Sequence, residues 1–221
     1  FTKFGIPEAE HNELLSYLQV GFSAAYGLFQ VPAGIVIDFF GPHLFLTGSI
    51  VVWSLGFGLL AFAPSTSVMY ASRYTLGLGQ SGVLAGIGRM TKLWFPAETR
   101  STAQGLLGVT ASRGGAFCCY LFFPLAMVYL FADSWQAAII ALASLGLLWA
   151  LLFFIFVRNS PSVHPRCNAA EVALIQGGEP RTGKAAAKRM GILELFRTAS
   201  GWGLANAIMI ALAASFSTVA D

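Results

Sequence analysis

Two arginines inside long apolar stretches, Arg73 and Arg113, are the residues best suited to bind an anion. Burying an arginine in hydrocarbon costs at least about 2.5–3.5 kcal/mol, so its side chain normally faces a water-filled cavity or a charged partner. A guanidinium can hold a carboxylate or a phosphate through two parallel hydrogen bonds. Arg73 therefore indicates a site for a small organic anion. For Arg113, which precedes two glycines, a cavity and a bond between helices are equally open.

Polar side chains accompany Arg73 at helical spacing. Gln80 lies seven residues further on, about two turns along the same face. In an earlier apolar stretch, Gln19, Tyr26 and Gln30 are spaced by seven and four residues, which predicts a polar stripe on one helix. We expect Arg73 to bind the anion, and Gln80, Tyr26 and Gln30 to line the cavity with it. The alternatives are that Arg73 extends outward to the membrane surface or pairs with a residue outside this sequence, and that the stripe only packs.

The composition requires an all-α integral membrane protein. Apolar residues make up 56% of the 221 residues and charged residues only 10%, whereas a soluble domain has about 25% charged residues. The mean hydropathy is +0.69. Since a segment of about 20 apolar residues spans a bilayer as a helix, we expect membrane helices at 14–36, 44–63, 66–93, 102–130, 134–157 and from about 201 onward.

The chain divides at one polar, basic stretch. We expect a transmembrane bundle at 1–157, a cytoplasmic connector at 158–200 and the start of another membrane helix at 201–221. In the connector, Asn168 and Glu171 are similar to a capping box, which predicts a short helix at 169–176. A second, amphipathic helix is expected at 192–197 against the membrane surface. The sequence begins without Met and ends while still apolar, which suggests an internal piece of a longer protein.

The basic residues predict the orientation. Of the 13 Lys and Arg, ten lie on one side of the predicted helices: Arg89, Lys92, Arg100, Arg158, Arg166, Arg181, Lys184, Lys188, Arg189 and Arg197. Because positive loops remain in the cytoplasm, we expect 37–43, 94–101 and 158–200 to be cytoplasmic in a multi-pass protein of the plasma membrane. The net charge of +3 reflects this asymmetry and does not indicate binding to nucleic acid.

Two patterns imitate nucleotide-binding loops and are rejected. Gly77-x-Gly79-x-x-Gly82 matches the dinucleotide fingerprint but falls inside a predicted helix, with no preceding strand. These glycines, with Gly86, predict a helix-packing face instead. A phosphate-loop pattern, Gly178-x-x-x-x-Gly183-Lys184, lacks the Ser or Thr that holds magnesium, and we interpret it as a flexible basic linker.

No cofactor or metal site is expected. Cys118 and Cys119 are adjacent and Cys167 stands alone, so we interpret all three as small apolar residues. His43 and His164 have no nearby carboxylate in the sequence, and the predicted spans contain no paired carboxylates. A membrane-embedded enzyme is therefore disfavoured.

A short turn joins the first two predicted helices and carries Gly34-x-x-x-Asp38-x-x-Gly41. Helices joined so tightly must be antiparallel, and we expect the glycines to let the two backbones approach each other. Asp38 is the only carboxylate between Glu13 and Glu98. We interpret Asp38 as part of a latch at a helix end.

Several of these motifs resemble the major facilitator superfamily. Gly34-x-x-x-Asp38-x-x-Gly41 is similar to its loop between helices two and three, and Arg73-x-x-x-Gly77-x-Gly79 to its helix-four motif. Further matches resemble the anion:cation symporter branch: Trp94-Phe95-Pro96-x-x-x-Arg100-x-x-Ala103-x-Gly105 and Pro161-x-x-His164-Pro165-x-x-Asn168-x-x-Glu171. The resemblance spans Leu14 to Ile175. It implies helices two to six and the start of seven of a transporter of hexuronates, aldonates, aldarates, sialic acid or similar anions.

The chain departs from the family pattern at several positions. Phe39 and His43 replace basic residues, which leaves Arg100 as a partner for Asp38 in a latch with Gly34 and Gly41. Thr99 replaces a Glu. Gln80 stands where many members have the Glu that couples transport to protons. Because Gln cannot titrate, coupling through this position is in doubt, and exchange, uniport or coupling elsewhere stay open.

The sequence therefore predicts a monomeric secondary transporter, or symporter, of small organic anions that works by alternating access in the lipid bilayer. The resemblance admits H+ or Na+ as a coupling ion. Two alternatives remain, namely an organophosphate exchanger and a non-transporting receptor that senses a ligand in the same cavity.

Overall fold

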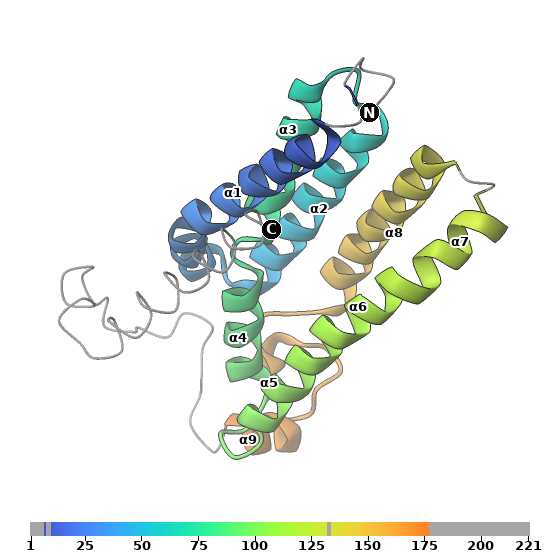
Figure 1. Ribbon diagram of the computed structural model, residues 1–221. Helices are drawn as coiled ribbons and strands as arrows, with labels where there is room; N and C mark the ends of the chain where they lie inside the picture. The colour runs from blue at the N-terminus through green and yellow to red at the C-terminus, as the bar shows by residue number, and fades with distance from the viewer. Residues whose placement is uncertain (1–6, 8–9, 132–133, 177–221) are drawn as a thin grey trace.

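The described part of the protein is a bundle of helices. The computed structural model describes residues 7, 10–131 and 134–176, and every regular element in them is a helix. Three of these helices are long and apolar enough to cross a membrane (Figure 1): α1 (His11–Phe40), α2 (Pro42–Ala61) and α8 (Trp135–Phe156). The expectation of an all-α membrane protein is confirmed.

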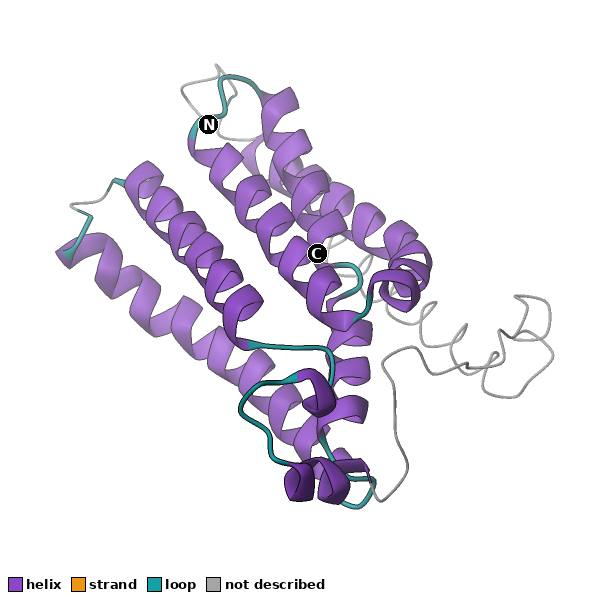
Figure 2. Ribbon diagram, turned by 180° about the vertical axis from the view of Figure 1, so that it is seen from behind, coloured by secondary structure: helices purple, strands orange, loops and turns teal. Residues whose placement is uncertain are grey.

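Shorter helical segments make up the rest of the described fold. In chain order they are α3 (Thr66–Gln80), α4 (Val83–Trp94), α5 (Arg100–Val109), η3 (Thr110–Gly114), α6 (Gly115–Phe117), η4 (Cys118–Phe122), α7 (Phe123–Tyr129), η5 (Pro161–Val163) and α9 (Ala169–Gln176). Figure 2 shows α8 running beside the continuous rod formed by α5 to α7, while α4 and α9 lie at one end of the molecule.

The helix predicted at 66–93 is divided in two. α3 ends at Gln80 and α4 begins at Val83, so Ser81 and Gly82 form a turn between them. The Ser81 hydroxyl donates to the Leu78 carbonyl at 2.8 Å, and the Ser81 N–H donates to the same oxygen at 3.3 Å. A serine side chain that bonds a backbone carbonyl one turn earlier competes with the backbone hydrogen bonds of the helix. This local competition, next to a glycine, explains the break.

The helix predicted at 102–130 is continuous but irregular. It contains two π-helical segments, η3 (Thr110–Gly114) and η4 (Cys118–Phe122), separated by the three residues of α6. π-helical turns are rare and often occur at functional positions. Arg113 lies in the first of these segments. Periodicity alone could not reveal the irregularity, because a π turn adds only one residue to a helix.

Glycines bring α3 into backbone contact with both α1 and α2. A Cβ at Gly77 would collide with the carbonyl oxygen of Phe22 on α1, and a Cβ at Gly79 would lie 2.7 Å from the backbone nitrogen of Trp53 on α2. Small residues permit such close approach in membrane bundles. Gly82 and Gly86 similarly meet side chains of α1 and α2. The prediction that these glycines form a packing face is confirmed.

The expectation that Gly34 lets the backbones of the first two helices approach each other was wrong. A Cβ at Gly34 would meet nothing within 4 Å, so this glycine brings no described backbones together. Gly41 is instead the glycine that forms the tight turn between α1 and α2. Its φ of +80° allows α1 to end at Phe40 and α2 to begin at Pro42, with Gly41 as the single residue between them. Such a positive φ is readily adopted by glycine alone.

The first connector helix agrees with its sequence signal. α9 covers Ala169–Gln176, as predicted, and the Asn168 Oδ1 accepts the Glu171 N–H at 2.8 Å. This is the N-cap bond that the Asn168 and Glu171 spacing predicted. The linker motif at 178–184, the amphipathic helix predicted at 192–197 and the segment 201–221 lie outside the described residues.

Replacing Gly77 by Ala should separate α1 from α3. We expect a loss of about 1–3 kcal/mol in stability, because the added methyl group meets backbone, which cannot move aside as a side chain can. The measurement is the thermal unfolding midpoint of the purified full-length protein. Gly27→Ala is the matched control, because a Cβ there meets nothing within 4 Å. Equal midpoints for the two variants would contradict the close approach.

Candidate functional site

Arg73 lies in the middle of α3, seven residues after its first residue, Thr66. Its side chain is partly buried, and its Nε atom is buried without a hydrogen-bond partner among the described residues. An unpartnered buried donor of a charged group costs about 1–3 kcal/mol or more. Water, a ligand or another polar group must satisfy this guanidinium when the protein is in its membrane.

The polar residues predicted to line a cavity with Arg73 lie at similar depths on two adjacent helices. Gly77 on α3 meets Phe22, Ala25 and Tyr26 of α1, whereas Gly82, further along, meets Ala33 of α1. Residue numbers thus increase together, so α1 and α3 run in the same direction. Tyr26 lies level with Gly77, and Gln30 falls between the two contacts, as Gln80 does.

The side chains of this group have few internal partners. Tyr26, Gln30 and Gln80 are partly buried, and the ring of Tyr26 stacks on Phe22 with centroids 6.1 Å apart. Within the described residues, none of these three side chains makes a hydrogen bond to another side chain. Together with Arg73, they span about three turns of two parallel helices. The two helices thus carry amide and phenol groups within a few turns of a cation, a set of groups that suits a hydroxylated anion.

Arg113 is separate from this group. Its side chain is exposed, and it belongs to the rod of α5 to α7, which packs through α5 against α4 and through α7 against α8. The described contacts therefore do not bring Arg113 to the face that carries Arg73. The sequence did not decide between a cavity and a helix–helix bond for Arg113, and the described residues supply no partner for either.

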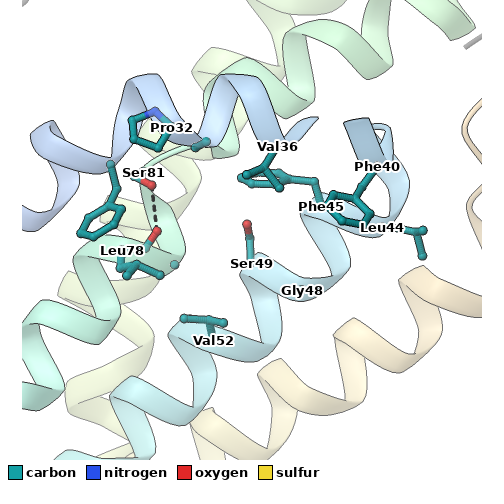
Figure 3. A pocket seen from close by; sticks show the side chains of 13 residues that line it. Pro32, Val36, Phe40, Leu44, Phe45, Gly48, Ser49, Val52, Leu78 and Ser81 are labelled. Atoms are coloured by element: carbon teal, nitrogen blue, oxygen red, sulfur yellow. Dashed lines mark hydrogen bonds between the residues drawn. The ribbon is translucent and has the colours of Figure 1, made fainter. Parts of the chain in front are cut away.

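A described cavity lies on another side of α3. It has a volume of about 480 Å³ and is lined by residues of α1 and α2, by Leu78 and Gly79 of α3 and by Ser81 of the turn that follows α3. Figure 3 shows its apolar lining, with Val36 and Phe40 from α1 facing Leu44 and Val52 from α2. Arg73, Gln80, Tyr26 and Gln30 are not among its lining residues. This apolar space is therefore distinct from the polar group around Arg73.

The sequence places Asp38 in a turn, but the structure places it in the last turn of α1, where it forms an ion pair. Arg89 of α4 donates from Nη1 to Oδ1 of Asp38, near the end of α1. The expected partner, Arg100, is engaged elsewhere: its Nη2 donates to the carbonyls of Lys92 and Phe95, each at 3.3 Å. Arg100 thus caps the end of α4 and does not bind Asp38. A helix cannot satisfy its own last carbonyls, which explains this alternative use of Arg100.

The sequence places Arg89 among the basic residues on the same side of the membrane as Asp38. Nothing in the sequence distinguishes it from the other basic residues there as the partner of Asp38. Its pairing with Asp38, 51 residues earlier, depends on how α4 lies against the end of α1. The Asp38 side chain is 64% exposed and that of Arg89 26%. An ion pair this open contributes only about 0–1 kcal/mol to stability, which suits an interaction that must open and close.

The comparisons with known proteins agree on one family. A family model described as Major Facilitator Superfamily matches residues 2–220. A probable sulfoacetate transporter from Cupriavidus necator is 30% identical over 192 residues, which cover 83% of this chain and 44% of that protein. A galacturonate transporter from Dickeya chrysanthemi is 28% identical, over 86% of this chain and 54% of its own length. A hexuronate transporter from Escherichia coli K12 is also 28% identical, over 86% and 43%. The chain thus spans about half the length of these relatives.

A double-mutant cycle can identify the partner of Asp38. We expect Asp38→Asn and Arg89→Gln to couple by about 0.2–1 kcal/mol in thermal unfolding of the full-length protein, and the coupling to shrink as salt is added. Asp38→Asn and Arg100→Gln should be additive, because Arg100 binds backbone carbonyls. Coupling to Arg100 and additivity with Arg89 would reverse the assignment.

Proposed function

Because the chain belongs to the Major Facilitator Superfamily, we propose that it is part of a secondary transporter that carries small organic anions across the membrane by alternating access. The observation that carries this proposal is Arg73, which is partly buried in a membrane bundle and whose buried Nε has no hydrogen-bond partner among the described residues. A cation held there in a water-filled cavity would replace the hydration of a carboxylate.

The substrate class is inferred from the relatives. They are named for galacturonate, hexuronate and sulfoacetate, and each of these molecules carries at least one anionic group. Because these relatives are only 28–30% identical to this chain, their names support a class of substrate and not one compound. We propose sugar acids or similar small carboxylates. All of these relatives are named as transporters, which supports a non-enzymatic protein.

Each residue of the group has a proposed task. Arg73 would bind the anionic group through two parallel hydrogen bonds. Gln80, Tyr26 and Gln30 would orient the hydroxyls of the substrate, since amide and phenol groups can both donate and accept. Arg113 would join the site only if the rod of α5 to α7 turns toward α3, and the irregular helix around Arg113 supports such a movement.

The latch would stabilise one of the two access states. Asp38 and Arg89 form the ion pair, Gly41 shapes the turn, and Arg100 fixes the end of the helix that carries Arg89. We propose that this end of the bundle faces the cytoplasm of a multi-pass plasma-membrane protein, as the basic residues suggest. The domain division of 1–157, 158–200 and 201–221, a monomeric state and a coupling ion remain proposals of the same kind.

Removing the charge of Arg73 should abolish transport. We expect uptake by the full-length Arg73→Gln variant to fall at least about tenfold, since one charge-assisted hydrogen bond is worth about 1.5–3 kcal/mol. Arg73→Lys should retain part of the activity. The measurement is uptake into proteoliposomes of a panel containing hexuronates, aldarates, sulfoacetate and sugar phosphates.

The matched control for Arg73→Gln is Arg166→Gln, which removes an exposed cation after α8. Its uptake should equal that of the parent protein. Normal uptake by Arg73→Gln would exclude Arg73 from the site. Ligand binding by the parent protein without any flux would favour a sensor, and preference for sugar phosphates would favour an organophosphate exchanger.

Introducing a carboxylate at Gln80 should make transport depend on pH. An amide cannot bind a proton at physiological pH, whereas a glutamate in a partly buried site can titrate there. We expect a pH gradient to drive little accumulation by the parent protein and more by Gln80→Glu. Strong acid-driven accumulation by the parent would show that another residue couples protons. The matched control is Gln136→Glu, which adds the same group on another helix, α8.

A further inference from the structure

The first turn of α2 and the end of α8 bind each other's unsatisfied backbone groups. The side-chain oxygen Oδ1 of Asn159, three residues after the end of α8, accepts the backbone N–H of His43 at 2.9 Å. His43 is the second residue of α2, so its N–H has no partner inside its own helix. Asn159 thus caps a helix that begins 117 residues earlier in the chain.

His43 makes the reciprocal bond. Its Nε2 lies 3.1 Å from the carbonyl oxygen of Phe154, in the last turn of α8. A carbonyl only accepts, so Nε2 must carry the proton. His43 is 6% exposed, and its imidazole ring stacks against Phe153 and Phe154. Each helix end therefore supplies the capping group of the other.

Gly41 makes room for this arrangement. With its φ of +80°, a Cβ at this position would lie 2.9 Å from both Oδ1 and Nδ2 of Asn159. The Asn159 side chain thus fills the space that the missing Cβ leaves. Gly41 follows Asp38 by three residues, so Asn159 contacts the turn directly after the helix end that carries Asp38, the acidic half of the latch.

The basic half of the latch is attached to the same segment. Arg89 lies on α4, whose last residue is Trp94. The Trp94 Nε1 donates to the carbonyl of Arg158 at 3.0 Å, and the edge of its ring meets His164 with centroids 5.5 Å apart. His164 in turn bonds the carbonyl of Phe156 through Nε2 at 3.2 Å.

Both partners of the ion pair are thus anchored to residues 154–164. Asp38 is held through Gly41 and Asn159, and Arg89 is held through Trp94 and Arg158. The charges themselves are exposed and contribute little on their own. Their meeting therefore depends on the position of the segment at the end of α8.

Resting on the transport function proposed above, we infer that Asn159 and His43 are positioning residues that couple the Asp38–Arg89 latch to the end of α8. The connector begins at that end, so a displacement of the connector changes how readily the ion pair forms. Switching elements of this kind have two discrete packings, because a capping bond is either made or broken. Trp94 extends the same coupling to α4.

The test compares Asn159→Ala with Asn159→Asp in the full-length protein. Aspartate keeps the acceptor oxygen and suits a helix N-terminus, so it should behave as the parent protein. We expect Asn159→Ala to lower the maximal uptake rate by about fivefold, the size of one lost cap. In an Asp38→Asn background the same substitution should change the rate less than about twofold, because no latch is left to position.

A readout without substrate makes the inference independent of the proposed function. Amide hydrogen exchange of residues 38–46 should be faster in Asn159→Ala and unchanged in Asn159→Asp. His43→Gln, which retains an N–H donor, should exchange more slowly than His43→Ala.

Three outcomes would overturn the inference. They are unchanged exchange in Asn159→Ala, equal effects of Asn159→Asp and Asn159→Ala, and the same fold-change in uptake with and without Asp38. Absence of uptake by the unsubstituted protein would contradict the proposed function instead, and the exchange measurements would still decide whether Asn159 holds the turn.

Discussion

The close contact of α3 with α1 and α2 is the constraint on which the described bundle depends. Gly77 lies against the backbone of α1 and Gly79 against that of α2, so α3 is fixed in depth and rotation by two neighbours. In hydrocarbon there is no hydrophobic force to draw helices together, and shape-matched backbone contact replaces it. Because Arg73 precedes Gly77 by one turn, this contact also determines the depth at which the cation is held.

Two kinds of polar interaction follow from that framework. On α3, the buried Nε of Arg73 has no hydrogen-bond partner among the described residues, which is consistent with the proposed ligand site. Near the end of α1, by contrast, Asn159 accepts from His43, the Arg158 carbonyl accepts from Trp94, and the Phe154 carbonyl is bonded by both His43 and Arg158. Partly satisfied polar groups suit a site that exchanges ligands, whereas fully paired groups specify one arrangement. The proposed transporter would need both.

The latch combines a weak ion pair with firmly held helix ends. Its ion pair is exposed and weak, so small changes in position can open or close it. Its two halves lie on α1 and α4, and each half is attached through neutral hydrogen bonds to the end of α8. Neutral bonds are insensitive to salt, while the ion pair is screened by it. Positioning and switching are thus carried by different interactions.

The sequence by itself determined the membrane class, most helix positions, α9 and its cap, and the glycine packing face. Each of these follows from composition or from spacing within one segment, because a helix satisfies its backbone locally. It also selected Arg73, since a charge among apolar residues stands out wherever it occurs. Only the tertiary structure decided that Arg89 and not Arg100 meets Asp38, that Gly34 packs against nothing described, and that Asn159 caps α2. These depend on how helix ends far apart in sequence meet, and such a meeting leaves no periodic signal along the chain.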